Sequence, residues 1–232
     1  MRNQTLKRAL LVGLLMLCVI VASAAYSMLA SKPRYLEVKI SYPPEQTENP
    51  KVEVVPIDAS WAFWYPDLES VMNRHSTVIV GEVESSNMLD QREGLEALGF
   101  THHKVKVLEV VKGDLQSGDV ITVSQCGGIY TSPNGETTNY EFEDDPLMKV
   151  GEISLLFLNG PTVQEIVSDK EVYLGTSPQT RFIVENGKVF WMGDVFTDRR
   201  IMRIADEVMW VNGRPVETVL ARLEEIQESA EK

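Results

Sequence analysis

Cysteine is scarce in this chain, whose 232 residues contain only Cys18 and Cys126. Cys18 lies in an apolar N-terminal run, which leaves Cys126 as the single thiol of the remaining sequence. One thiol excludes an intramolecular disulfide there, even in a compartment that permits oxidation. Folding must therefore depend on a hydrophobic core, and the sequence beyond residue 60 is long enough to bury one.

Positive charge is also scarce, with 22 Lys and Arg against 34 Asp and Glu and a net charge of −12. Residues 1–30 hold three of the bases and no acid, so residues 31–232 carry 19 bases against 34 acids, a net charge of −15. A phosphate backbone requires a cationic surface. We therefore expect no nucleic-acid binding, and no binding of anionic lipid by the folded part.

The common reactive motifs are missing as well. The sequence contains no Gly-x-Gly-x-x-Gly, Walker A loop, His-Glu-x-x-His, Cys-x-x-Cys or Gly-x-Ser-x-Gly. Nucleotide cofactors, helix-borne zinc hydrolysis, dithiol chemistry and a nucleophile elbow thus lack support. We predict no catalytic residue, no cofactor and no metal site.

A thiolate–imidazole pair is the strongest alternative to that prediction. Cys126 ends one expected strand, and His102 and His103 lie in the strand that precedes it in the sequence. Successive strand residues point to opposite faces, so at most one imidazole approaches the thiol, and the two rings cannot easily share a metal ion. We expect an inert thiol, and histidines that are exposed or at an edge.

Three other groups of side chains have a structural interpretation. The acidic run fits no EF-hand spacing, so we expect a solvated loop rather than a calcium site. The basic group is expected at a strand or helix edge, paired with carboxylates, and the aromatic group is expected to seal one end of the core. These groups are Glu141, Glu143, Asp144 and Asp145; Arg199, Arg200 and Arg203; and Trp61, Phe63, Trp64 and Tyr65.

The one long apolar run is uncharged from Ala9 to Ala30, and its 22 residues give about 33 Å of helix. The bases at 1–8 precede it, so the positive-inside rule predicts a cytoplasmic N-terminus, a single-pass membrane anchor at 9–30 and an extracytoplasmic domain. The alternative is a signal peptide cleaved near Ala24, which would make the protein secreted.

The remaining chain divides into three expected parts. Residues 31–59 contain five prolines and read as an extended linker, in which scattered valines and isoleucines permit a short strand or two. Residues 60–200 form the main domain. Residues 201–232 form a C-terminal helical extension packed on it, whose apolar stripe is Val216, Val219, Leu220, Leu223 and Ile226.

Strands dominate the main domain. A short helix capped by Asp67 and ending near His75 precedes them. The expected strands are 77–84, 101–112, 120–126 and 151–158, followed by a hairpin of 181–184 and 188–192 around Asn186-Gly187. A change of apolar phase near Leu108 predicts a bulge or strong bend. We expect a closed or nearly closed five-strand barrel over 77–193.

Several strings of this pattern resemble a known domain. They are Val78-Ile79-Val80-Gly81-Glu82-Val83, Val105–Gly113, Gly118-Asp119-Val120-Ile121-Thr122-Val123, Pro146-Leu147-Met148-Lys149-Val150-Gly151-Glu152 and Leu155-Leu156-Phe157-Leu158. Together they look like an uncharacterised bacterial extracytoplasmic domain that is similar to the barrel of tissue inhibitors of metalloproteinases and netrin-like modules. The resemblance implies a mainly β, OB-like five-strand barrel flanked by short helices over about residues 65–195. Protease inhibition does not carry over, because no cysteine occupies the position that chelates zinc in the animal inhibitors.

Composition, predicted topology and resemblance together favour a membrane-anchored or secreted binding or interaction module, with an unknown protein or envelope ligand and unknown binding residues. An envelope enzyme that uses Cys126 with a nearby histidine is the alternative. A netrin-like protease inhibitor is the third hypothesis, and it depends on fold analogy alone.

Overall fold

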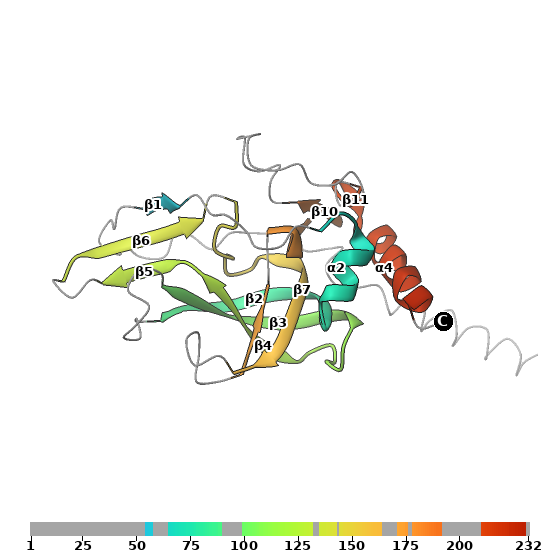
Figure 1. The fold of residues 1–232 in the computed structure, drawn as a ribbon, viewed down its shortest axis with the longest axis horizontal. Helices are drawn as coiled ribbons and strands as arrows, with labels where there is room; N and C mark the ends of the chain where they lie inside the picture. The colour runs from blue at the N-terminus through green and yellow to red at the C-terminus, as the bar shows by residue number, and fades with distance from the viewer. Residues whose placement is uncertain are drawn as a thin grey trace, which may run out of the picture. The chain divides into compact units, whose positions relative to one another are not determined.

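A computed structural model describes residues 54–57, 65–89, 99–131, 135–142, 144–163, 171–175, 178–191 and 210–230 (Figure 1). The predicted anchor at 9–30 and most of the predicted linker lie outside the described residues, as do Trp61, Phe63, Trp64, Glu143, Arg199, Arg200 and Arg203. Within the described ranges, no helix has both the length and the apolar character that a membrane crossing requires.

The described chain is mainly β, with two α-helices. Its elements are β1 (Val54–Ile57), α2 (Leu68–Arg74), β2 (Thr77–Leu89), β3 (Phe100–Lys112), β4 (Val120–Cys126), β5 (Gly128–Thr131), β6 (Thr137–Phe142), β7 (Ile153–Thr162), β8 (Val172–Leu174), the 3-10 helix η2 (Pro178–Thr180), β9 (Arg181–Glu185), β10 (Lys188–Trp191), β11 (Arg214–Pro215) and α4 (Val216–Ala230).

Five strands close into a barrel in the order β7-β2-β3-β4-β8, and a β7–β8 pairing completes the circle. The β4–β8 pairing is parallel and the other four are antiparallel. This closed five-strand barrel confirms the predicted architecture. Its strand order and its single parallel pairing are compatible with an OB-like fold.

The fifth barrel strand is not the predicted one. β8 occupies that place, whereas the hairpin of β9 and β10 extends the sheet outside the barrel together with β11. The cause is a fork along one edge of β7: residues 154–156 pair with β9, and residues 159–162 pair with β8. A three-residue strand is too short to show the alternation by which strands are recognised.

The predicted bend in β3 is confirmed at Leu108. Val80 lies opposite Glu109 and the next residue, Gly81, lies opposite Val107, so Leu108 is the extra residue of a bulge. A β-carbon on Gly81 would overlap the side chain of Val105. Glycine therefore permits the close approach of the two strands next to the bulge.

Apolar side chains fill both sides of the barrel sheet. Alternation in β7 turns Leu156 and Leu158 into the barrel core, while Leu155 and Phe157 are also buried but lie outside that cluster. Phe157 contacts Phe182 edge-on outside the barrel, and α2 and α4 lie side by side near this end of the sheet (Figure 1). All five residues of the predicted α4 stripe are buried, which confirms the amphipathic helix.

The predicted short helix is also confirmed. Asp67 is the N-cap of α2 and accepts a 2.6 Å hydrogen bond from the backbone N–H of Ser70, and His75 is the C-cap. Lys112 of β3 donates a 2.6 Å hydrogen bond to the carbonyl of Met72 in the last turn. A lysine at this end satisfies a terminal carbonyl and complements the helix dipole.

A second sheet has the order β1-β6-β5. Its β5 and β6 form an antiparallel pair between residues 128 and 142, where the sequence predicts no strand. β1 pairs in parallel with β6. The possibility of a short strand in the linker is thus confirmed for Val54–Ile57.

Candidate functional site

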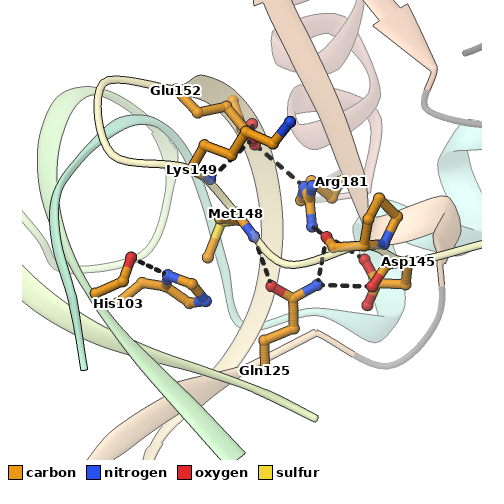
Figure 2. A network of polar contacts seen from close by, with 10 residues as sticks. His103, Gln125, Asp145, Met148, Lys149, Glu152 and Arg181 are labelled. Carbon is orange, nitrogen blue, oxygen red and sulfur yellow. Dashed lines mark hydrogen bonds and ion pairs between the residues drawn. The ribbon is translucent and has the colours of Figure 1, made fainter. Parts of the chain in front are cut away.

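A buried polar cluster at one side of the barrel centres on Arg181, the first residue of β9. Its side chain is 6% exposed and faces two carboxylates: Nη1 lies 3.1 Å from Oδ1 of Asp145, and Nε lies 3.2 Å from Oε1 of Glu152 (Figure 2). Nη1 also donates a 2.6 Å hydrogen bond to the carbonyl of Pro146. The guanidinium thereby joins β9 to the segment between β6 and β7, from Asp145 to Glu152 just before β7.

Gln125 of β4 holds the same segment from the barrel side. Its Nε2 donates 3.0 Å hydrogen bonds to the carbonyls of Asp145 and Pro146, and its Oε1 accepts a 3.0 Å hydrogen bond from the N–H of Met148 (Figure 2). One buried side chain therefore satisfies three backbone groups of a segment that has no strand partner. This positions Asp145 against Arg181.

Both carboxylate oxygens of Glu152 accept hydrogen bonds. Oε1 accepts a 2.7 Å hydrogen bond from the hydroxyl of Ser154, and Oε2 accepts a 3.3 Å hydrogen bond from the N–H of Lys149.

Burial raises the pKa of Asp145, against the opposing effects of Arg181 and Gln125. Desolvation is the dominant effect because the carboxylate has lost most of its water.

His103 lies inside the barrel and is completely buried. It is opposite Ser86 of β2 in the strand register, and its Nδ1 is 2.8 Å from the hydroxyl of Ser86. Burial lowers the pKa of His103 to about 4, and the positive charge of Arg181 acts in the same direction. The imidazole is therefore neutral at neutral pH.

Two predictions for these residues are wrong. Asp144 and Asp145 do not form a solvated acidic loop: Asp144 is 7% exposed, and Asp145 is paired with Arg181. His103 is neither exposed nor at an edge, although the expectation that the two histidines face opposite ways agrees with a half-buried His102. The reason is tertiary, because an internal arginine and the barrel wall remove these polar groups from water.

Cys126 ends β4 as predicted and is a half-buried free thiol. It lies opposite Phe100, whereas His102 and His103 lie opposite Ser124 and Val123. Burial raises the pKa of Cys126 to about 11. A nucleophilic cysteine requires the opposite shift, toward thiolate near neutral pH.

The other candidates are placed as follows. Tyr65 is buried as expected for a residue that seals the core, and Glu141 is half-buried on β6. Across the described part of the chain, no cluster of three or more His, Cys, Asp or Glu side chains has an arrangement that suits a metal ion.

Sequence reasoning missed the residues that organise this cluster. In the sequence, Arg181 starts an expected hairpin strand, Gln125 lies within the expected strand 120–126, and Glu152 ends the string that begins at Pro146. The available signal was a charged or amide side chain placed next to apolar strand residues, as in Arg181-Phe182 and Glu152-Ile153. Such residues are almost never buried without partners, so their position predicts a partner, although not which one.

Comparison with known proteins adds no relative: no protein-family model matches this chain, and neither does any curated protein. The similarity to netrin-like modules thus stays a prediction.

Proposed function

We propose that this protein is a non-catalytic binding module, built on an OB-like barrel and displayed outside the cytoplasmic membrane. The observation that carries the proposal is the use of the buried polar groups. Arg181 pairs with Asp145 and Glu152, and Arg181, Gln125 and Glu152 each bind backbone groups of residues 145–149, at distances between 2.6 and 3.3 Å. Groups committed in this way stabilise a fold and are poorly placed for proton or group transfer.

The state of the thiol supports the same conclusion over the enzyme alternative. A pKa of about 11 leaves Cys126 protonated at neutral pH, and the strand register sets Phe100, rather than a histidine, opposite it. A thiol nucleophile is usually activated by an adjacent base or a lowered pKa. No observation favours the protease-inhibitor hypothesis beyond the resemblance.

Thiol alkylation on the detergent-solubilised full chain tests the non-catalytic character. We expect the rate of iodoacetamide reaction at Cys126 to rise with pH through 9 without reaching a plateau. Cys126→Ser should retain whatever partner the wild-type chain captures. A rate that reaches its plateau well below the free-thiol pKa of about 8.5 would reveal an activated thiolate and replace this proposal with the enzyme alternative.

Binding itself is tested with the full chain as bait for envelope extract, with Arg181→Met as a fold-disrupted comparison. A partner retained by the wild-type chain and lost by the variant supports the proposal, and the absence of any specific capture contradicts it.

The location is tested separately, by a reporter fused after Lys232. Activity of a cytoplasm-only reporter there would contradict the proposed topology, which depends on the apolar run at 9–30.

A further inference from the structure

β1 is the outer strand of the three-stranded sheet, and its residues belong to the predicted linker. Its four residues pair in parallel with β6, from Val54 opposite Asn139 to Ile57 opposite Phe142. Figure 1 shows β1 lying along β6, away from the two helices. Val55 is 37% exposed and Pro56 is also exposed, so half of the strand's side chains contribute little burial. Backbone pairing over four residues is therefore an important part of what holds β1.

Pro56 fixes which backbone groups of β1 face its neighbour. In a strand, alternate residues turn both N–H and C=O toward the same side. Proline has no N–H, so it is tolerated where its nitrogen faces away from the pairing strand. By this alternation, the backbone groups of Val55 and Ile57 face β6, and Val55 lies opposite Tyr140.

Pro56 also disfavours the addition of a further strand to the outer edge of β1. An edge strand that lacks a donor on its outer side is a poor template for another strand. The larger sheet ends in the same way at β11, which contains Pro215.

β6 has none of this protection. Its sequence is Thr137-Thr138-Asn139-Tyr140-Glu141-Phe142, which contains no proline, lysine or arginine. Four of these six residues are β-branched or aromatic. With β1 removed, this strand becomes the outer strand of a pair with β5. Such an edge accepts an extended segment by main-chain hydrogen bonding.

On the basis of the binding function proposed above, we propose that the edge of β6 is a strand-acceptor site, at which an extended segment of a partner protein replaces β1. The occupant seen in the structure defines the chemistry of that segment. Val-Val-Pro-Ile is uncharged, extended and rich in β-branched residues. The four paired residues therefore place no negative charge next to Glu141 of β6, in a domain whose net charge is −15 over residues 31–232.

Two proline variants of the full chain distinguish the loss of a β1–β6 hydrogen bond from the mere introduction of a proline into β1. Val55→Pro removes an N–H that faces β6, whereas Val54→Pro removes one that faces away and serves as the matched control. The probe is a fluorescein-labelled peptide of residues 51–60, Lys-Val-Glu-Val-Val-Pro-Ile-Asp-Ala-Ser, measured by fluorescence anisotropy. We expect at least tenfold tighter binding to Val55→Pro than to wild type or Val54→Pro. The peptide that itself carries Val55→Pro should not bind.

Equal affinity of the peptide for all three chains, or no binding to any, overturns the proposal. Amide hydrogen exchange shows whether Val55→Pro is folded, because an unfolded variant would lose protection in β2, β3 and β4. In that case the wild-type chain is measured with excess peptide. Slower exchange in residues 137–142 supports the acceptor site, and unchanged exchange there overturns it.

A partner captured by the wild-type chain distinguishes this proposal from the binding function on which it depends. Displacement of that partner by the unlabelled 51–60 peptide, but not by its Val55→Pro form, supports strand replacement. Capture without displacement overturns the acceptor site and leaves the binding function standing. Absence of any capture contradicts the binding function, and with it the partner half of this proposal.

Discussion

The side chain of Gln179 pairs with the backbone of Tyr65 as a neighbouring strand would. Its Oε1 accepts a 2.8 Å hydrogen bond from the Tyr65 N–H, and its Nε2 donates a 2.9 Å hydrogen bond to the Tyr65 carbonyl. Both residues are buried and 114 positions apart in the sequence. One amide thus fixes the backbone of the residue that lies just before α2.

Gln179→Ala should lower the free energy of unfolding by about 2–4 kcal/mol, because two buried backbone groups of Tyr65 lose their partner. Chemical unfolding followed by tryptophan fluorescence measures the change. Gln116→Ala is the matched control: Gln116 is exposed, so its truncation should change stability by less than about 0.5 kcal/mol. Equal effects of the two variants would show that the Gln179 pairing contributes nothing of its own.

Arg181→Met should cost about 3–5 kcal/mol, because it leaves Asp145 and Glu152 buried without their shared cation. Arg222→Met is the control, since Arg222 pairs with Glu225 on the surface with both side chains more than half exposed. A pair of that kind contributes about 0.5 kcal/mol or less. A loss below 1 kcal/mol for Arg181→Met, measured by denaturant unfolding, would contradict the assignment of Arg181 as the centre of the cluster.

Acid should destabilise the protein through its buried histidines. The pKa of His103 is lowered to about 4 and that of His75 is also lowered, in both cases chiefly by burial. The unfolded chain therefore binds more protons below about pH 6.5, and the contribution of His103 falls by about 3 kcal/mol as pH falls from 6.5 to 4. The raised pKa of Asp145 acts in the opposite direction, so the measured loss is the net of the two.

His103→Asn tests this acid sensitivity. Asparagine keeps a polar group within reach of Ser86 but does not titrate, so the slope of unfolding free energy against pH should decrease by up to one proton between pH 4 and 6.5. Gln116→Ala, at an exposed residue that does not titrate, is expected to leave the slope unchanged. An unaltered slope for His103→Asn in urea titrations across that range would exclude His103 as a source of acid lability.

Phe157→Ala should cost about 3–5 kcal/mol, because Phe157 is completely buried and contacts His75 and Phe182 edge-on. Thermal or chemical unfolding measures the loss. Val120→Ala is a suitable comparison, because Val120 is 51% exposed and should tolerate truncation with little change. Similar losses for both variants would contradict the placement of Phe157 in the core.

The sequence by itself determined the local elements. Alternating or continuous apolar runs placed β2, β3, β4 and β7, and the Asn186-Gly187 pair placed the β9–β10 turn, where both residues have positive φ angles. The change of phase at Leu108 marked the bulge, and helical spacing marked α4. These features depend on residues close in the chain, so their physical causes, side-chain period and turn chemistry, are visible in one dimension.

Only the tertiary structure decided how the barrel closes and what its polar residues do. β8 joins β4 and β7 through residues too few to show a period, and β1 reaches β6 from the linker. Gln125, Arg181 and the two carboxylates Asp145 and Glu152 come from three separate segments, and the sequence gives no signal that brings these segments together. Burial, pKa and pairing are properties of a shared environment, and the chain creates that environment only when distant segments meet.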